Sequence, residues 1–106
     1  MKLYVDDERS APDGWTRVMT SAAALELLAN AREAGQSVDA LSLDHDLGGD
    51  DTTRPIVMWM CEHEWWPTRV SVHSMNPIGR QYLEEMVRRY APANTLAPLP
   101  YGGSPE

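Results

Sequence analysis

The sequence VDALSLDHDLGGDD, residues 38–51, decides the fold. Its first part, Val38 to Leu43, has the length and apolar content of a strand, and this strand ends in a loop rich in Asp and Gly. A helix is predicted to begin near Thr53, because Arg54-Pro55 follows and proline is favoured in a first helical turn. A strand, a loop and a helix in this order indicate a parallel sheet with helical crossovers.

The N-terminal part of the chain has the same order. Lys2 to Val5 is predicted to be a strand that ends in the acidic run Asp6 to Arg9, and Thr16 to Thr20 is predicted to be a second strand. Thr20 or Ser21 can cap the helix that follows, which we expect to end at Gly35. The first strand, like the third, therefore leads into an acidic loop.

The C-terminal part adds a fourth strand and a helix. Arg69 to His73 alternates valine with polar residues, and Asn76-Pro77 begins a helix with its apolar residues on one face. Thr95 to Leu99 is predicted to add an edge strand, which its prolines shorten. Residues 100–106 are predicted to be a flexible tail.

Strands that alternate with helices predict the α/β class. We expect one domain, residues 1–106, with a parallel sheet of about five strands and helices on both faces. In the flavodoxin-like strand order 2-1-3-4-5, ligands bind beyond the carboxyl ends of the first and third strands. Because these are the two strands that end in acidic loops, the sequence predicts converging carboxylates at that edge.

Four carboxylates are the predicted metal ligands: Asp6, Asp7, Asp44 and Asp46. Two carboxylates about 4 Å apart repel each other by roughly 4 kcal/mol at an effective dielectric constant of about 20. A divalent cation that takes oxygen ligands and bridges to a phosphate would neutralise them, so we expect Mg²⁺ or Mn²⁺. Protons shared between the acids, or ordinary solvated loop acids, are the alternatives.

Five other positions on the same predicted rim are candidates for acid–base chemistry or phosphate binding. His45 and His73 can transfer protons, and His73 is preferred because an extended backbone points His45 away from its acidic neighbours. The alternative is that each histidine is only a hydrogen-bonding spacer. The candidates for phosphate binding are Arg9, Ser74 and Asn76. Arg9 can also pair with the adjacent acids, and Asn76 also suits a helix cap.

The composition narrows the classes of function. The 106 residues carry 9 basic and 16 acidic side chains, a net charge of −7, and residues 1–53 hold 11 acids against four basic residues. Because no basic stripe is present, binding to duplex DNA is not expected. No signal peptide or membrane-spanning run is visible, and the single Cys61 cannot form an internal disulfide, so we expect a cytoplasmic protein.

Common nucleotide and metal motifs are missing from the sequence. There is no glycine-rich phosphate loop, no H-E-x-x-H and no paired C-x-x-C. Residues 44–51 imitate the start of a calcium loop, but Gly48 occupies its fifth position and Pro55 its twelfth, where a bidentate Glu is required. The stretch is therefore not an EF-hand.

Three blocks in sequence order carry a family resemblance: LYVDDER (residues 3–9), SLDHDLGG (42–49) and VSVHSMNPIG (70–79). They resemble the cyclic-phosphate processing receiver domains, a divergent branch of the response-regulator receiver superfamily. The resemblance implies a receiver-like sheet in which Asp6 and Asp7 replace the metal-binding acid pair and Asp44 replaces the phosphoacceptor. The residues that match the branch's own additions are His45, Asp46, His73, Ser74 and Asn76.

The chain departs from the general receiver pattern in two places. Lys2 is the only lysine, so the lysine that receivers carry after the fifth strand is missing. Residues 6–14 are too short for the usual first helix, which we expect to be shortened or missing. Both departures argue against phosphorelay signalling.

Two hypotheses for the function follow. In the first, the protein is a divalent-metal-dependent phosphoesterase for cyclic phosphate ends of RNA or nucleotides, the substrate class that the resemblance implies. Asp44 holds the metal or attacks directly, and His73 or His45 moves the proton. In the second, it is a non-catalytic receiver-like binding or regulatory module that acts through a protein partner or a sequestered ligand, since a fold alone does not certify catalysis.

Overall fold

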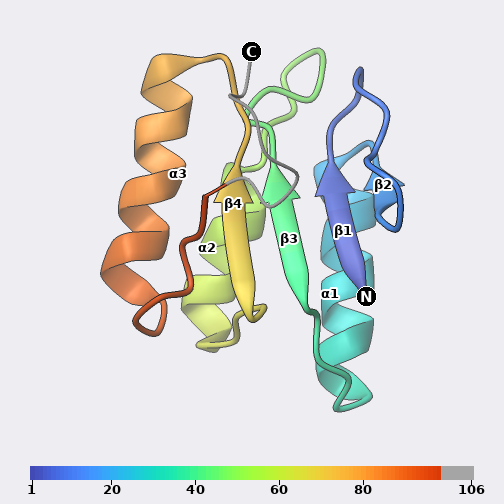
Figure 1. The fold of residues 1–106 in the computed structure, drawn as a ribbon, viewed down its shortest axis with the longest axis vertical. Coiled ribbons are helices and arrows are strands. Elements are labelled where there is room, and N and C mark those ends of the chain that lie inside the picture. Colours follow the sequence, from blue (N-terminus) through green and yellow to red (C-terminus); the bar gives the residue numbers. More distant parts are fainter. Residues whose placement is uncertain (99–106) are drawn as a thin grey trace.

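The computed structural model describes residues 1–98, which form four strands and three helices. Their order is β1 (Lys2–Val5), β2 (Thr16–Val18), α1 (Ser21–Glu33), β3 (Ala40–Leu43), α2 (Arg54–His63), β4 (Arg69–Val72) and α3 (Pro77–Tyr90). All strand pairs are parallel, and the strand order is β2-β1-β3-β4 (Figure 1). The predicted α/β class and strand order are confirmed. The tail predicted for residues 100–106 lies outside the described residues.

The predicted fifth strand is reduced to a single bridge, in which Leu96 pairs in parallel with Val70 of β4. The Val70 N–H donates to the Thr95 carbonyl at 2.8 Å, and the Ala97 N–H donates to the Val70 carbonyl at 2.9 Å. Pro98 has no N–H with which to continue such a ladder. The segment therefore lies beside β4, where a fifth strand would pair, but it pairs at one residue only.

The helix that receivers carry after the first strand, which was expected to be shortened or missing, is absent from residues 6–15. Residues 6–15 form a loop between β1 and β2, with a tight turn in which the Trp15 N–H donates to the Pro12 carbonyl at 3.1 Å. Gly14 lies in this turn with φ of +86°, a conformation that glycine adopts without strain. The loop leads directly from the acids after β1 to the edge strand β2.

The core lies on one face of the sheet. Its strand residues alternate along β1, β3 and β4 and join buried residues of all three helices. These strand residues are Leu3, Val5, Leu41, Leu43, Val70 and Val72. In Figure 1, α1 and α2 lie behind the sheet, and α2 contacts both α1 and α3. No helix in residues 1–98 combines the length and the apolar character that a membrane span requires.

The opposite face carries polar and aromatic side chains. Tyr4 and Ser42 alternate with the core residues and are buried. The Trp15 indole meets the Tyr4 ring edge-on, with centroids 6.3 Å apart, and the Lys2 ammonium lies 5.9 Å from the Trp15 ring centroid. Helices were expected on both faces, but in residues 1–98 all three helices pack on the core face, and Trp15 packs on the opposite face.

The helices begin at the carboxyl edge of the sheet, and two begin with a side-chain cap. The Thr20 hydroxyl accepts the Ala23 N–H at 3.1 Å at the start of α1. The Asn76 side chain accepts the Gly79 N–H at 3.1 Å at the start of α3. The positive ends of the helix dipoles therefore face the edge that carries the strand-end acids.

Candidate functional site

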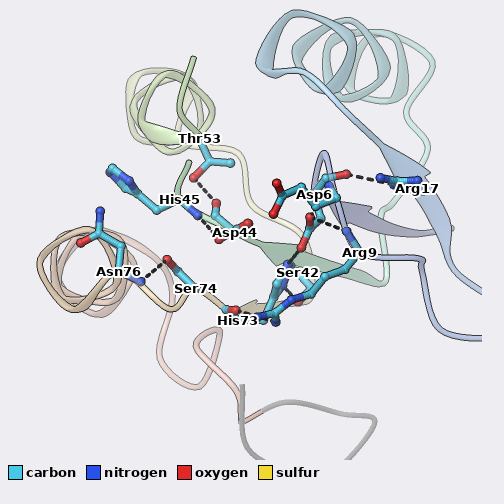
Figure 2. A network of polar contacts seen from close by, with 11 residues as sticks. Asp6, Arg9, Arg17, Ser42, Asp44, His45, Thr53, His73, Ser74 and Asn76 are labelled. Atoms are coloured by element: carbon cyan, nitrogen blue, oxygen red, sulfur yellow. Dashed lines mark hydrogen bonds and ion pairs between the residues drawn. The ribbon is translucent and has the colours of Figure 1, made fainter. Parts of the chain in front are cut away.

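A cavity of about 340 Å³ opens at the carboxyl edge of the sheet. Its lining comes from the loops after β1, β3 and β4: Asp6, Asp7, Glu8, Arg9, Asp44, Asp46, Gly48, Ser74, Met75 and Asn76. Figure 2 shows Asp6 and Asp44 at the ends of neighbouring strands, with Arg9 and His73 close to Asp6. Of the predicted site residues, the structure brings all but His45 and His73 to the surface of this cavity.

Asp6 is fully buried and held by three donors. Its Oδ1 accepts the backbone N–H groups of Glu8 and Arg9 at 2.8 and 2.9 Å, and its Oδ2 lies 3.0 Å from Nε2 of His73. Burial by itself raises the pKa of this carboxyl, but the hydrogen bonds from Arg9, Glu8 and His73 outweigh it and hold the pKa below its usual value. Asp6 is therefore an ionised carboxylate inside the protein.

His73 lies beneath Asp6 and is 1% exposed. Its Nδ1 lies 2.8 Å from the Ser42 hydroxyl, and its ring stacks on Tyr4 with centroids 4.3 Å apart and planes 3° from parallel. Burial lowers its pKa to about 4 despite the opposing effect of Asp6. The ring is thus neutral at pH 7. Because the Asp6 carboxylate can only accept, Nε2 carries the proton and Nδ1 accepts from Ser42.

Asp44 is half-buried at the end of β3. Its Oδ1 accepts the His45 N–H at 2.8 Å, and its backbone carbonyl accepts the Thr53 hydroxyl at 2.6 Å. Its pKa is raised, mainly by burial and further by the charge of Asp6, against the lowering effects of the His45 N–H, the Ser74 hydroxyl and Arg9. The described protein groups therefore do not fully compensate the negative charge at Asp44.

The carboxylates of Asp6 and Asp44 converge with the His73 ring. One ligand atom from each lies within 4.8 Å of the other two. Since His73 donates its Nε2 proton to Asp6, the oxygen atoms of the two acids are the available ligands. Two carboxylates, one of them with a raised pKa, fit a hard divalent cation that takes oxygen ligands. His73 then orients one of these ligands from the second layer.

Asp7 also lines the cavity, next to Gly48. A Cβ placed on Gly48 would lie 2.9 Å from Oδ2 of Asp7, and Gly48 has φ of +88°. Both observations explain a glycine here, because a side chain would strain the backbone and press on the carboxylate. Asp7 lines the same cavity as Asp6 and Asp44, but among residues 1–98 it is outside the group of ligand atoms that lie within 4.8 Å of one another.

Asp46 and Asn76 form a bridge at the cavity mouth. The Asp46 side chain is 61% exposed, and its oxygens lie 3.1 Å from His45 Nδ1 and 3.1 Å from Asn76 Nδ2. Asn76 also caps α3 through its Oδ1. The polar atoms of both side chains are thus engaged within the protein. The predictions of Asp46 as a metal ligand and Asn76 as a phosphate contact gain no support from this geometry.

His45 lies against α3, with its ring turned away from Asp6 and Asp44 (Figure 2). It is 6% exposed, and its Nε2 accepts the Arg54 Nε–H at 2.9 Å while its Nδ1 faces Asp46. A Cβ on Gly79 would overlap its ring. His45 therefore packs and forms hydrogen bonds within the protein, and this geometry gives no support to the prediction of a catalytic role. The sequence favours His73 over His45 as a catalytic residue, but His73 also faces the protein interior and does not line the cavity.

Ser74 and Arg9 remain at the cavity surface. The Ser74 hydroxyl accepts the Asn76 N–H at 3.0 Å and lowers the pKa of Asp44 through a hydrogen bond. One terminal nitrogen of Arg9 donates to the His73 carbonyl at 3.4 Å. Arg9 also lines the cavity, and its positive charge lowers the pKa of Asp44.

The residues that contact His73 beneath the carboxylates, Tyr4 and Ser42, were not predicted from the sequence. The Ser42 hydroxyl donates to Nδ1 of His73, and Tyr4 covers the imidazole face. Each precedes a site acid by two positions, so each lies on the same side of its strand as Asp44 or Asp6. Ser42 is the one polar residue in the apolar strand Ala40–Leu43, and this position could have indicated a buried hydrogen-bonding role.

A parallel sheet of order β2-β1-β3-β4, with acids after β1 and β3 at one edge, defines a receiver-like domain. The family model of the cyclic-phosphate processing receiver domain matches residues 1–89, and the chain belongs to this family. No curated protein and no solved structure matches the chain.

Proposed function

We propose that this domain is a divalent-metal-dependent phosphoesterase that acts on cyclic phosphate ends of nucleotides or RNA. The observation that carries the proposal is the pair Asp6 and Asp44, two facing carboxylates at the cavity floor of which one has a raised pKa. Membership of a family described as cyclic-phosphate processing supports the substrate class.

The ion in this proposal is Mg²⁺ or Mn²⁺, held by Asp6, Asp7 and Asp44. When bound, such an ion supplies positive charge to the phosphate oxygens and lowers the pKa of a coordinated water. The chain's own contribution is to fix the ligands. The backbone N–H groups of Glu8 and Arg9 and the His73 ring leave Asp6 little freedom to rotate.

Arg9 and Ser74 would bind and orient the phosphate. The Arg9 backbone N–H is fixed on Asp6, so its guanidinium starts from an anchored position beside the carboxylates. A guanidinium can form two parallel hydrogen bonds with phosphate oxygens. Ser74 offers a hydroxyl from the neighbouring loop, on the β4 side of the same cavity.

The proton transfer falls to Asp44, because both histidines of the site are turned inward. Water attacks phosphorus, a new P–O bond forms, and one ester bond of the cyclic phosphate breaks. Asp44 accepts the proton that the water loses and returns it to the departing alkoxide oxygen, which leaves a phosphate monoester. The carboxylate oxygen of Asp44 that does not hold the ion takes this role.

A non-catalytic binding module is the second candidate. His73 and His45 are 1% and 6% exposed, and their ring nitrogens are engaged with Asp6, Ser42, Asp46 and Arg54. In this view the site sequesters a phosphate ligand, and a protein partner binds the ligand-bound form of the domain. Duplex DNA remains an unexpected partner, because the cavity lining is acidic.

The proposal is tested by incubating the protein with a nucleoside 2′,3′-cyclic phosphate and following the ³¹P resonances. We expect the monoester to appear with Mg²⁺ or Mn²⁺ and not with EDTA. Asp44→Asn should abolish the conversion. Asp13→Asn is the matched control, because it removes the same charge from an exposed turn outside the cavity. Ligand-induced shifts without conversion would instead favour the binding module.

A further inference from the structure

We infer that the site takes a nucleoside cyclic phosphate, a small substrate with one phosphate charge, and discriminates against the cyclic phosphate end of a longer RNA strand. The inference rests on the proposed function and narrows its substrate class. It depends on the charges that surround the cavity, on the size of the cavity and on its one large apolar side chain.

The lining of the cavity is strongly acidic. Among residues 1–98 it contains five carboxylates against one guanidinium: Asp6, Asp7, Glu8, Asp44, Asp46 and Arg9. One divalent cation together with Arg9 would still leave this lining with an excess of negative charge. A single phosphate held by the cation and Arg9 is tolerated there, whereas each further phosphate meets the uncompensated acids at the mouth.

The other basic side chains of the described residues do not form a path from the cavity. Five lie at the opposite edge of the sheet, at strand starts or in last helical turns: Lys2, Arg32, Arg69, Arg88 and Arg89. The remaining three are engaged within the protein, and two of them, Arg17 and Arg54, bond to residues next to the cavity. Arg17 donates to the Asp6 carbonyl, Arg54 donates to His45, and Arg80 pairs with Glu84.

A polynucleotide needs such a path. Proteins that hold single strands line a groove with positive charge and add aromatic rings on which successive bases stack. At low salt, repulsion between exposed charges extends over about 10 Å or more. The second and third phosphates of a strand would therefore lie within reach of Glu8 and Asp46 at the mouth.

The size and surface of the cavity fit one nucleotide. Its volume of about 340 Å³ lies near the lower end of the range for small-molecule sites, roughly 300 to 1,000 Å³. Met75 lies between Ser74 and Asn76 in the lining and is 61% exposed. An exposed thioether beside the phosphate contacts offers an apolar surface for a ribose or a base.

The test compares kcat/KM for a nucleoside 2′,3′-cyclic phosphate with kcat/KM for a ten-nucleotide RNA that ends in the same cyclic phosphate. With Mn²⁺ and salt of about 20 mM, we expect the nucleoside to be preferred by about tenfold or more, and the ratio to fall as salt rises to about 300 mM. Glu8→Gln should reduce the preference at low salt. Glu62→Gln, the same charge change at the far end of α2, should leave it unchanged.

The outcomes separate this inference from the proposed function. An RNA end that reacts as well as the nucleoside, or a preference that salt and Glu8→Gln leave unchanged, would overturn the inference and leave the phosphoesterase intact. Failure of both substrates to react would overturn both. A salt-sensitive preference for the nucleoside, reduced only by the variant at the cavity, would establish it.

Discussion

Nε2 of His73 lies 3.0 Å from Oδ2 of Asp6, although the two residues are 67 positions apart in the sequence. Each side chain is only 1% exposed. A neutral imidazole that donates to a buried carboxylate stabilises the ionised form of that carboxylate. His73 therefore acts on a substrate only through Asp6, as a positioning residue.

The first prediction concerns the pH dependence of stability. The pKa of His73 is about 4 in the folded protein and 6.5 in the reference state, so the unfolded chain binds more protons between these values. Stability is therefore fully present above about pH 6.5 and decreases as the pH falls toward about 4, by up to about 3 kcal/mol. Urea denaturation in EDTA across this range measures the effect.

His73→Gln is the control for this dependence. We expect the variant to be less stable at pH 7 but to lose much of the slope between about pH 6.5 and about pH 4. Asp6 titrates at lower pH and Asp44 contributes with the opposite sign, so the comparison of wild type with the variant reports His73 together with its effect on Asp6. An unchanged slope would show that another group dominates the acid sensitivity.

The second prediction is that Asp44→Asn stabilises the metal-free protein near neutral pH. Asp44 has a raised pKa, so folding favours its protonated form and the ionised group reduces stability as the pH rises through that pKa. A neutral amide relieves this cost while its oxygen still accepts the His45 N–H. We expect a rise of a few degrees in Tm with EDTA, and no rise for Asp13→Asn.

The third prediction is stabilisation by a divalent ion. A ligand at 100 times its Kd adds about 2.7 kcal/mol to the free energy of unfolding, and about 4 to 8 °C per kcal/mol is usual for a domain of this size. Mg²⁺ or Mn²⁺ at saturating concentration should therefore raise Tm by about 10 °C or more. Asp44→Asn should abolish the rise. No shift with either ion would argue against a tight metal site.

The fourth prediction tests the packing of His45 on α3. A Cβ at Gly79 would overlap the His45 ring, so Gly79→Ala should destabilise the protein by about 1 to 3 kcal/mol. In a His45→Ala background the same change should cost much less, because the ring is gone. Chemical denaturation of the four proteins in this cycle gives the coupling. Equal costs in both backgrounds would contradict the contact.

The fifth prediction tests Asn76 as a structural residue. Asn76→Ala removes the α3 cap and the contact with Asp46, and we expect a loss of about 1 kcal/mol. Asn76→Ser keeps a capping oxygen and should retain most of the stability. Both variants should keep kcat/KM per folded molecule within a fewfold range. A large loss of kcat/KM in the stable serine variant would restore Asn76 as a phosphate contact.

Much of the fold followed from alternation along the chain. Apolar strands that end in acids, with helices between them, predicted the parallel sheet and the place of the cavity at the ends of β1 and β3. The polar face was not predicted. Trp15, which lies in a loop, covers part of this face. Periodicity in the sequence does not predict where the side chain of a loop residue packs.

The candidate site was predicted less completely. Asp6 and Asp44 were expected to converge, because strand ends meet at one edge. The burial of His73 was not expected, since a residue just after a strand suggests an exposed rim. Its partners Tyr4 and Ser42 come from two other strands. Such contacts depend on side-chain packing across the sheet, which a single sequence does not specify.

The all-parallel pairing of the strands also has a kinetic consequence. Asp6, Asp44 and His73 each follow a different strand, so they meet only after β1, β3 and β4 have paired. Pairings between segments this distant in sequence form slowly, because a long loop must close before any contact is gained. During synthesis, Asp6 therefore gains its His73 hydrogen bond only after β4 has paired with β3.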